Sequence, residues 1–310
     1  MKKVELIKIR KDYPGFSINV DFYVNKGEFV SILGPSGSGK TTTLHIIAGF
    51  IQQDSGKIIK DGKDISALPP NKRNIGIVFQ DYALFPYLTV FSNIAFGLRV
   101  KHAKEEEIKQ AVYSLSEQLG ITHILNKYPE MISGGEKQRV ALARAMIVNP
   151  DVLLMDEPLS SLDAKIREKL MKDLKLFHKK FHTTILYVTH DQSEAMYLSE
   201  RIILMNNGRI DQIGTPIELY EHPKTPFART FIGKMNRIRI NGKERYVRPE
   251  DIIIRKDGRM KGTIKEILYL NGIAEIYVER DKENIIIRDL LRNVRSLKQG
   301  NTITFDIGGD

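Results

Sequence analysis

The sequence predicts an α/β fold in which a mostly parallel sheet with helical crossovers is followed by a small all-β module. Two observations lead to this prediction. Up to about residue 235, short and nearly unbroken apolar runs alternate with stretches of helical periodicity, as in sheets buried on both faces. Beyond that point short β-rich runs separated by turn signals take over, and no further helical stretch of useful length is visible.

The elements follow in order along the chain. Residues 3–9 and 16–24 alternate apolar and polar side chains, which is typical of half-buried antiparallel strands, so the chain is expected to open with a small sheet. Five apolar runs then predict buried strands: FVSIL (29–33), IGIVF (75–79), VLLM (152–155), TILYVT (184–189) and IILM (202–205). Helices are expected near residues 41–49, 104–119, 135–148, 163–180 and 191–198.

Proline and glycine cluster at 214–216, 222–226 and 232–238, which indicates a domain boundary near 235. We therefore expect one domain over 1–235 and a small β-barrel-like domain over 236–310.

Composition excludes several classes of site. The 310 residues contain no cysteine, so disulfides, thiolate metal sites and cysteine catalysis are ruled out. The formal charge of +10 could indicate nucleic-acid binding, but acidic neighbours interrupt the basic residues, as at 101–109, and this favours an ordinary solvated surface. The start, MKKVELIKIR, does not resemble a secretory signal. The most membrane-like stretch, 83–98, is too short to span a bilayer, so any membrane role is expected to act through a partner.

The strongest motif is GPSGSGKT at 34–41, which fits the pattern G-x-x-x-x-G-K-[ST] between a predicted strand and a predicted helix. Its glycines allow a tight turn whose backbone N–H groups, with the positive end of the helix, point at phosphates. Lys40 adds a charge at the β and γ oxygens, and the Thr41 hydroxyl would ligate Mg²⁺. The residues expected to bind the nucleotide are Gly34, Pro35, Ser36, Gly37, Ser38, Gly39, Lys40, Thr41 and Thr42. A plain glycine-rich turn is the alternative.

A second motif, VLLMDEP at 152–158, places two carboxylates at the end of an apolar strand, where open α/β sheets bind ligands. Asp156 is expected to hold Mg²⁺ through its water shell, and Glu157 to polarise the attacking water as a general base. Alone, such a strand end usually has no function. The phosphate loop upstream favours the functional interpretation.

The segment ISGGEKQRVALARAM at 132–146 resembles the signature motif of ABC ATPases, and the span from about 4 to 235 follows the motif order of that family. The resemblance implies a P-loop ATP-binding cassette with an antiparallel β subdomain and a helical subdomain. It also implies ATP and Mg²⁺ as cofactors. The signature would contact the γ-phosphate held by a second copy of the chain through Ser133, Gly134, Gly135 and Glu136.

Four further positions match motifs of the family. The resemblance implies that Tyr13 stacks on adenine, that Gln80 is the Q-loop residue and a Mg²⁺ ligand, that Asp163 ends the D-loop at 160–163 and that His190 is the switch histidine. The catalytic set would then be Lys40, Gln80, Glu157 and His190. Each match has a plainer interpretation, because His190 could simply end a strand and Tyr13 could belong to a turn, with Phe16 as the next aromatic candidate.

The signature departs from the family pattern at two places. Ile132 and Glu136 stand where Leu and Gln are usual. Because S-x-x-E is also a capping box, Glu136 can satisfy the backbone N–H of Ser133 much as Gln would. We expect function to be kept, with an effect of the added negative charge on rate.

The stretch at 80–99 and the tail resemble importer ATPases. Exposed aromatics at Tyr82, Phe85 and Tyr87 would receive a membrane subunit, although a core role is equally natural for some of them. VRPEDI at 247–252 resembles a short transport-associated OB-type domain. The resemblance implies a homodimer on the cytoplasmic face of the cell membrane, bound to two integral-membrane permease subunits and served indirectly by a substrate-binding protein.

Iron, oxyanions, phosphonates or polyamines are the expected cargo, with sugars as the alternative. A nucleic-acid-associated ATPase is a distant alternative, because an OB-like tail on a basic chain could bind nucleic acid. The single phosphate loop and the lack of a coiled-coil insertion argue against it, so no nucleic-acid partner is expected.

Overall fold

The computed structural model describes residues 1–308 apart from 161, 241 and 282. The chain divides into two compact units, Met1–Thr225 and Pro226–Asp310, and the boundary expected near 235 lies after the first helix of the second unit.

The first unit contains a ten-stranded sheet with the order β5-β4-β1-β2-β10-β9-β3-β8-β7-β6. Its strands are β1 (Lys2–Tyr13), β2 (Phe16–Asn25), β3 (Phe29–Leu33), β4 (Ser55–Lys60), β5 (Lys63–Asp64), β6 (Ile75–Val78), β7 (Val152–Asp156), β8 (Thr184–Thr189), β9 (Arg201–Asn206) and β10 (Arg209–Gly214).

The middle of this sheet is parallel, as the apolar runs predict. Strands β3, β7 and β8 are buried at every position, and β3 pairs in parallel with both β8 and β9. Burial on both faces requires helices on each side, and this explains why these runs are apolar throughout instead of alternating. The α/β prediction is confirmed.

The opening strands differ from the expectation in one respect. β1 and β2 pair antiparallel, as their alternation predicts, but they do not form a separate small sheet. A parallel pairing between Arg209 of β10 and Asn19 of β2 joins them to the main sheet. Their alternating faces bury Val4, Leu6 and Val20 in the same core as the parallel strands.

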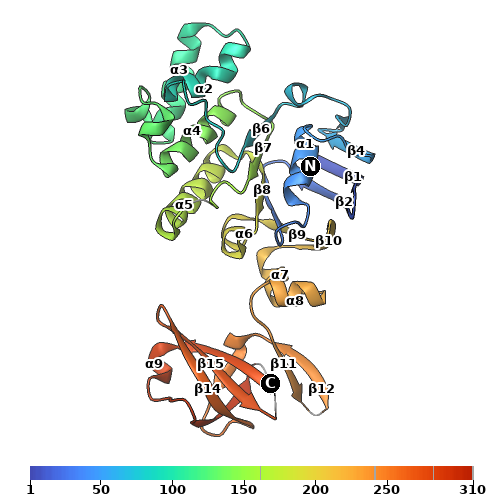
Figure 1. Ribbon diagram of the computed structural model, residues 1–310, viewed down its shortest axis with the longest axis vertical. Helices are drawn as coiled ribbons and strands as arrows, with labels where there is room; N and C mark the ends of the chain where they lie inside the picture. The colour runs from blue at the N-terminus through green and yellow to red at the C-terminus, as the bar shows by residue number, and fades with distance from the viewer. Residues whose placement is uncertain (161, 241, 282, 309–310) are drawn as a thin grey trace. The chain divides into compact units, whose positions relative to one another are not determined.

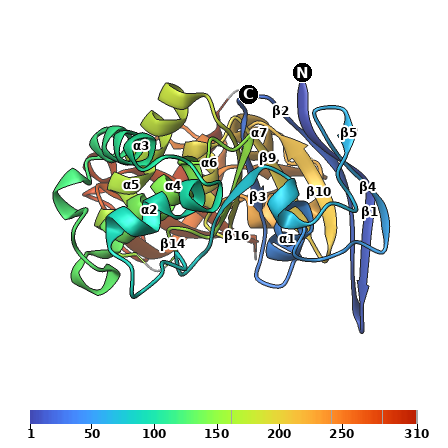
Figure 2. The same cartoon turned by 90° about the horizontal axis from the view of Figure 1, so that it is seen from above.

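All five expected helices are present, within two residues at each end. The helices of the first unit are α1 (Lys40–Ala48), α2 (Val90–Val100), α3 (Glu105–Gln118), α4 (Gly134–Met146), α5 (Ala164–Phe181), α6 (Gln192–Leu198) and α7 (Pro216–Glu221), with 3-10 turns η1 (Pro70–Lys72), η2 (Thr122–Ile124) and η3 (Pro129–Met131). Helices α2, α3 and α4 gather on the side of this unit opposite β1, β2 and β4 (Figure 1), and the turned view shows the same separation (Figure 2). They share a core of their own that includes Ile94, Val112 and Val140.

The second unit is mostly antiparallel β structure. A five-stranded sheet has the order β13-β17-β14-β15-β16, and β11 pairs with β12 as a hairpin. Its elements are α8 (Pro226–Phe231), β11 (Asn236–Ile240), β12 (Lys243–Val247), η4 (Pro249–Asp251), β13 (Ile252–Ile254), β14 (Met260–Leu270), β15 (Ile273–Arg280), β16 (Glu283–Leu290), α9 (Leu291–Val294) and β17 (Thr302–Ile307). Apolar residues that include Ile276, Ile287 and Phe305 form its core. This arrangement fits the expected small OB-like module.

Among the described residues, none of the helices combines the length and the apolar character that a membrane-spanning segment needs.

Candidate functional site

The carboxyl ends of four neighbouring strands meet at one edge of the parallel sheet. Leu33 of β3 is opposite Thr189 of β8, Asp156 of β7 is opposite Val188, and Val78 of β6 is opposite Met155. The loops that leave these strands are therefore adjacent. They carry the phosphate loop, His190, Glu157 and Gln80, which the sequence analysis selected from four separate places in the chain.

The phosphate loop leads from β3 into α1. Gly39 caps α1 with a φ of 94°, a left-handed conformation that favours glycine. A side chain at this position would lie 3.1 Å from Ile18 and 3.3 Å from Phe16. The turn between β9 and β10 supports the loop, because Gly208 N donates to the carbonyl of Ser38 at 3.1 Å. The loop thus presents its backbone at the start of α1, where N–H groups lack helical partners.

Lys40 is buried inside this loop, 4% exposed, and its Nζ donates to the carbonyl oxygen of Pro35 at 2.9 Å. Burial lowers the pKa of Lys40, while the nearby carboxylates of Glu157 and Asp156 act in the opposite direction. An anionic ligand in the loop would supply the charge partner that this buried ammonium group has only in part.

Thr41 and Asp156 lie together at the base of the loop. The Thr41 hydroxyl donates to Asp156 Oδ1 at 2.9 Å, and His45 Nε2 lies 3.8 Å from Asp156 Oδ2. Burial raises the pKa of Asp156, although the bond from Thr41 opposes the shift. A hydroxyl and a carboxylate side by side are hard oxygen ligands that fit Mg²⁺ once phosphate oxygens and water complete its shell. Within the described part of the chain no cluster of three or more His, Asp or Glu residues could hold a metal on its own.

Glu157 follows Asp156 with a φ of 43°, a left-handed backbone conformation that is uncommon outside glycine. Its backbone N–H donates to the carbonyl of Val188 at 3.0 Å. Its Oε2 lies 2.8 Å from His190 Nδ1. Two side chains that are 33 residues apart in the sequence are therefore in hydrogen-bond contact.

The signature segment forms the expected capping box. Ser133 is the N-cap of α4, its N–H donates to Glu136 Oε2 at 2.8 Å, and the Glu136 N–H donates to Ser133 Oγ at 3.4 Å. Hydrogen bonds from Ser133 to the carboxylate lower the pKa of Glu136. His123 Nε2 lies 3.3 Å from its other oxygen. Glu136 thus caps the helix as predicted.

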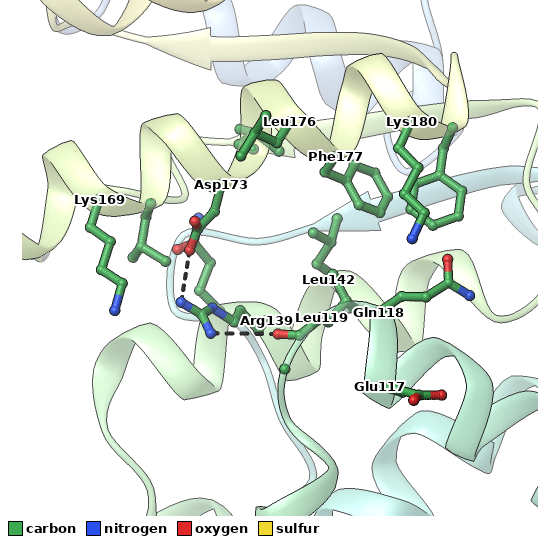
Figure 3. Close-up of a pocket in the computed structure, with 15 residues that line it drawn as sticks. Glu117, Gln118, Leu119, Arg139, Leu142, Lys169, Asp173, Leu176, Phe177 and Lys180 are labelled. Atoms are coloured by element: carbon green, nitrogen blue, oxygen red, sulfur yellow. Dashed lines mark hydrogen bonds and ion pairs between the residues drawn. The ribbon is translucent and has the colours of Figure 1, made fainter.

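Arg139 fixes the signature helix to the next long helix. Its guanidinium donates to Asp173 on α5 at 2.7 Å and to the carbonyl of Leu119 after α3 at 3.4 Å (Figure 3). Beside this bridge lies a cavity of about 450 Å³, with Leu142 and Phe177 among its lining residues. The cavity is lined by α3, α4 and α5 and does not include the phosphate loop.

Asp163 ends the predicted D-loop and is the N-cap of α5, where its side chain accepts from the N–H of Ile166 at 3.0 Å. The preceding Ser160 donates its hydroxyl to the carbonyl of Glu157 at 2.9 Å. Ser161, within the predicted loop, lies outside the described residues.

The two aromatic candidates for adenine contact lie in different surroundings. Tyr13 ends β1 and is 39% exposed, with Lys11 Nζ 5.9 Å from its ring centre. Phe16 begins β2, approaches Gly39 of the phosphate loop and lines a hollow of about 640 Å³ together with Arg209. Gln80, just after β6, is exposed.

One expectation about the aromatic stretch is wrong. Tyr82 is only 6% exposed, because a left-handed turn with a φ of 63° folds its ring into the core with Leu153 and Leu159. Phe85 and Tyr87 are 37% and 90% exposed. The ring of Phe85 packs against that of Phe96 in a tilted arrangement with ring centres 4.5 Å apart, and Phe96 is also exposed. We call Phe85, Tyr87 and Phe96 the aromatic patch.

Sequence reasoning also missed a polar cluster behind His190. Arg167 of α5 lies within ion-pair distance of Asp191 and of the buried Glu194 of α6. The sequence contains no motif that marks Arg167, because a single arginine in a helix rich in lysine resembles any surface residue.

Residues 18–160 match the family model described as ABC transporter. The spermidine/putrescine import ATP-binding protein PotA of Thermotoga maritima is 52% identical over 236 residues, which cover 76% of this chain and 64% of that relative. The sulfate/thiosulfate import ATP-binding protein CysA of Pectobacterium atrosepticum is 40% identical over 317 residues, which cover 97% of this chain and 96% of the relative.

Solved structures that resemble this chain include two ABC ATPases. CbiO1 of Clostridium perfringens, part of an ABC transporter complex, has a TM-score of 0.66 and 30% identity over 71% of this chain and 91% of its own. An ATP-binding cassette in a dimeric post-hydrolysis state with ADP and Pi has a TM-score of 0.61 and 34% identity over 69% of this chain and 98% of its own.

Proposed function

We propose that this chain, which belongs to the ABC transporter family as an ATPase of the import type, drives uptake of a small charged solute, with polyamines as the first class to test. The main support for a nucleotide-binding site is that four side chains meet at one edge of the sheet: Lys40, Asp156, Glu157 and His190. The substrate class rests on relatives named for spermidine and putrescine import.

ATP binds along the phosphate loop. Backbone N–H groups at the start of α1 and the ammonium group of Lys40 receive its phosphates. The hydroxyl of Ser38 supports this placement, because its Oγ is buried and has no hydrogen-bond partner among the described residues. Thr41 and Asp156 would hold Mg²⁺, which supplies charge neutralisation at the phosphates when bound.

Glu157 acts as the general base on the attacking water. It lies at the carboxyl end of β7 with a left-handed φ of 43°, and His190 Nδ1 holds its carboxylate at 2.8 Å. With one oxygen held by His190, the other is available to accept a proton from water. His190 is 51% exposed in its side chain, so it can also reach a γ-phosphate, and Gln80 lies on the adjacent loop.

Hydrolysis requires two copies of the chain. Gly134 and Gly135 open α4 with N–H groups that have no helical acceptor, and together with the N-cap residue Ser133 they form a second phosphate site. This site and the phosphate loop of a second copy together enclose one nucleotide. A dimeric relative with ADP and Pi supports this arrangement.

The aromatic patch is the surface for an integral-membrane permease subunit. Phe85, Tyr87 and Phe96 are large apolar side chains that remain exposed, and aromatic residues are enriched at protein interfaces. Arg144 lies 5.3 Å from the ring of Phe85 and donates to the carbonyls of Tyr82 and Ala83, which fixes the loop. Contact with the permease places the chain on the cytoplasmic face of the membrane, where a substrate-binding protein acts on it indirectly.

Reconstitution tests the proposal. The chain is purified together with its integral-membrane permease subunits and inserted in vesicles. ATP hydrolysis is then assayed with binding proteins loaded with spermidine, sulfate or a maltose-like sugar. We expect stimulation by spermidine alone. Stimulation by the sulfate-loaded binding protein would indicate a substrate like that named for the sulfate/thiosulfate relative. Stimulation by the sugar-loaded binding protein would overturn the proposed substrate class. A wild-type chain with no magnesium-dependent ATP hydrolysis in any of these mixtures would refute the whole proposal.

A further inference from the structure

The side chain of Arg167 connects helix α5 to the loop of His190. Arg167 lies in the first turn of α5, and its guanidinium group donates two hydrogen bonds and forms one longer ion pair. Nη2 donates to the carbonyl of Leu162 at 2.8 Å, and Nη1 donates to Asp191 Oδ2 at 3.4 Å. Nε lies 3.8 Å from Glu194 Oε1. The planar fork of arginine can bind the Leu162 carbonyl and the Asp191 carboxylate while its Nε stays at ion-pair distance from Glu194, an arrangement that a lysine ammonium group cannot reproduce.

The two carboxylates near Arg167, Asp191 and Glu194, follow His190 in the chain. Glu194 is 2% exposed, and its Oε2 accepts from the hydroxyls of Thr189 at 2.7 Å and Tyr187 at 2.8 Å. Thr189 Oγ1 in turn accepts from the N–H of Asp191 at 3.0 Å. The residues on both sides of His190 are therefore held in a network that ends at Arg167.

The other end of the network reaches Glu157. The segment after Glu157 turns back on itself, since Ser160 Oγ donates to the Glu157 carbonyl and Leu162 N–H donates to the carbonyl of Leu159. Arg167 holds Leu162, the last residue of this turn before Asp163 caps α5. The guanidinium group of Arg167 thus adds a further connection between the loops of Glu157 and His190, beside the direct contact of the two side chains.

We propose that Arg167 is a positioning residue that couples the 157–163 loop to the His190 loop, so that the general base and the histidine move as one unit. The inference rests on the proposed ATP hydrolysis. It also gives α5 a role in transmission, because Asp173 on the same helix binds Arg139 of the signature helix (Figure 3). Through α5, a shift of the signature helix would reach both loops.

The test measures steady-state ATP hydrolysis of the full chain with Arg167→Ala and Arg167→Lys. For Arg167→Ala we expect kcat to fall about tenfold or more, because small misplacements of reacting groups are costly. The KM for ATP should stay within about twofold, because Arg167 contacts neither Lys40 nor the phosphate loop. Arg167→Lys keeps the positive charge but lacks the planar guanidinium group, so kcat should remain well below that of the wild type.

Two further variants separate positioning from stability. Lys172→Ala is the matched control, because Lys172 lies on α5 in an exposed pair with Glu168 at 2.7 Å and should leave kcat unchanged. Glu194→Gln keeps size and hydrogen bonding but removes the charge. If the two residues act as a unit, Arg167→Ala combined with Glu194→Gln should lose no more activity than the worse single variant.

Three outcomes would overturn the inference: a kcat for Arg167→Ala within twofold of wild type, full recovery in Arg167→Lys, or single-variant losses that multiply in the double variant. If Arg167→Ala does not fold, Arg167→Lys and Glu194→Gln carry the same test. If the wild-type chain itself does not hydrolyse ATP, the proposed function is refuted. Failure of the proposed function and failure of the inference about Arg167 can therefore be told apart.

Discussion

Tyr13 and Phe16 compete for the role of adenine contact. Stacking of an aromatic ring on a base is worth about 1–3 kcal/mol. Replacing Tyr13 by Ala should therefore raise the KM for ATP about fivefold to a hundredfold while kcat at saturation stays nearly unchanged, because the contact is equal in ground and transition states. Steady-state kinetics with varied ATP measures both values.

The control is Phe16→Ala. Phe16 lies against Gly39 of the phosphate loop, so its loss should disturb the loop and lower kcat as well as affinity. An unchanged KM in Tyr13→Ala together with a raised KM and normal kcat in Phe16→Ala would assign the adenine contact to Phe16.

Individual residues were predictable where a motif demands a specific chemistry. Lys40, Thr41 and Asp156 are near one another because a phosphate loop and an acidic strand end imply a shared edge of the sheet. The prediction that Tyr82 is exposed was wrong. A left-handed turn folds its ring inward, and no residue type at this position indicates such a turn. Arg167 was missed because its partners Asp191 and Glu194 lie 24 and 27 residues further along the chain.

At the scale of elements, the signature helix packs closely against the loop that precedes α5. A Cβ added to Gly134 would lie 2.9 Å from Leu162 Cδ2, too close for a normal contact. Gly134→Ala should therefore fold, because a leucine side chain can yield, but displacement of Leu162 should reduce ATP hydrolysis. Adding Leu162→Ala removes the clashing atom and should restore most of the activity. Activity of Gly134→Ala equal to wild type would show that this contact has no consequence for the site.

The opposite end of β7 contains a charge cluster that makes stability depend on pH. Burial pushes the pKa of Asp151 upward, but hydrogen bonds from Lys60, Asn74 and Lys3 outweigh it and hold that pKa well below its usual range. The stabilisation is present above the unfolded pKa near 3.8 and decreases as pH falls toward the folded value.

Asp151→Asn should lower the midpoint of urea unfolding at pH 7, and the difference from wild type should shrink at pH 3. Asp21→Asn is a control at an exposed carboxylate. If the difference in urea midpoint between Asp151→Asn and wild type is the same at both pH values, the charge of Asp151 contributes nothing to folding stability.

Strongly patterned elements were predictable, and α2 was not. Its helix begins after Thr89, which caps it, and buries Val90 and Ile94 while exposing Phe96 and Val100. Apolar residues on both the buried and the exposed side hide the helical period, so the sequence resembled a continuous apolar stretch. Exposed apolar side chains on this face of α2 are explained if a partner protein covers them.

At the scale of the whole molecule, every proposed nucleotide contact lies in the first unit, before Thr225. A chain that ends at residue 236 should therefore keep ATP affinity and basal hydrolysis, because no core residue of the sheet is removed. Nucleotide titration and a hydrolysis assay measure this. A truncated chain that folds but binds ATP more than tenfold weaker would show that the second unit supports the site.

The α/β architecture was predictable because parallel strands need apolar residues on both faces and helices between them. The order of the strands was not, since the pairing of β2 with β10 rests on a single register contact between Asn19 and Arg209. Sequence patterns specify which face of a strand is buried and do not specify its neighbour.

The central claim is that two copies of this chain enclose ATP between the phosphate loop of one and the signature segment of the other. Glu157→Gln keeps the size of the side chain and its contact with His190 but removes the base, so ATP should remain bound and unhydrolysed. Size-exclusion chromatography with light scattering should then show a dimer with ATP and a monomer with ADP. A second change, Ser133→Arg, should abolish the dimer. A Glu157→Gln chain that stays monomeric at saturating ATP and high protein concentration would contradict the claim.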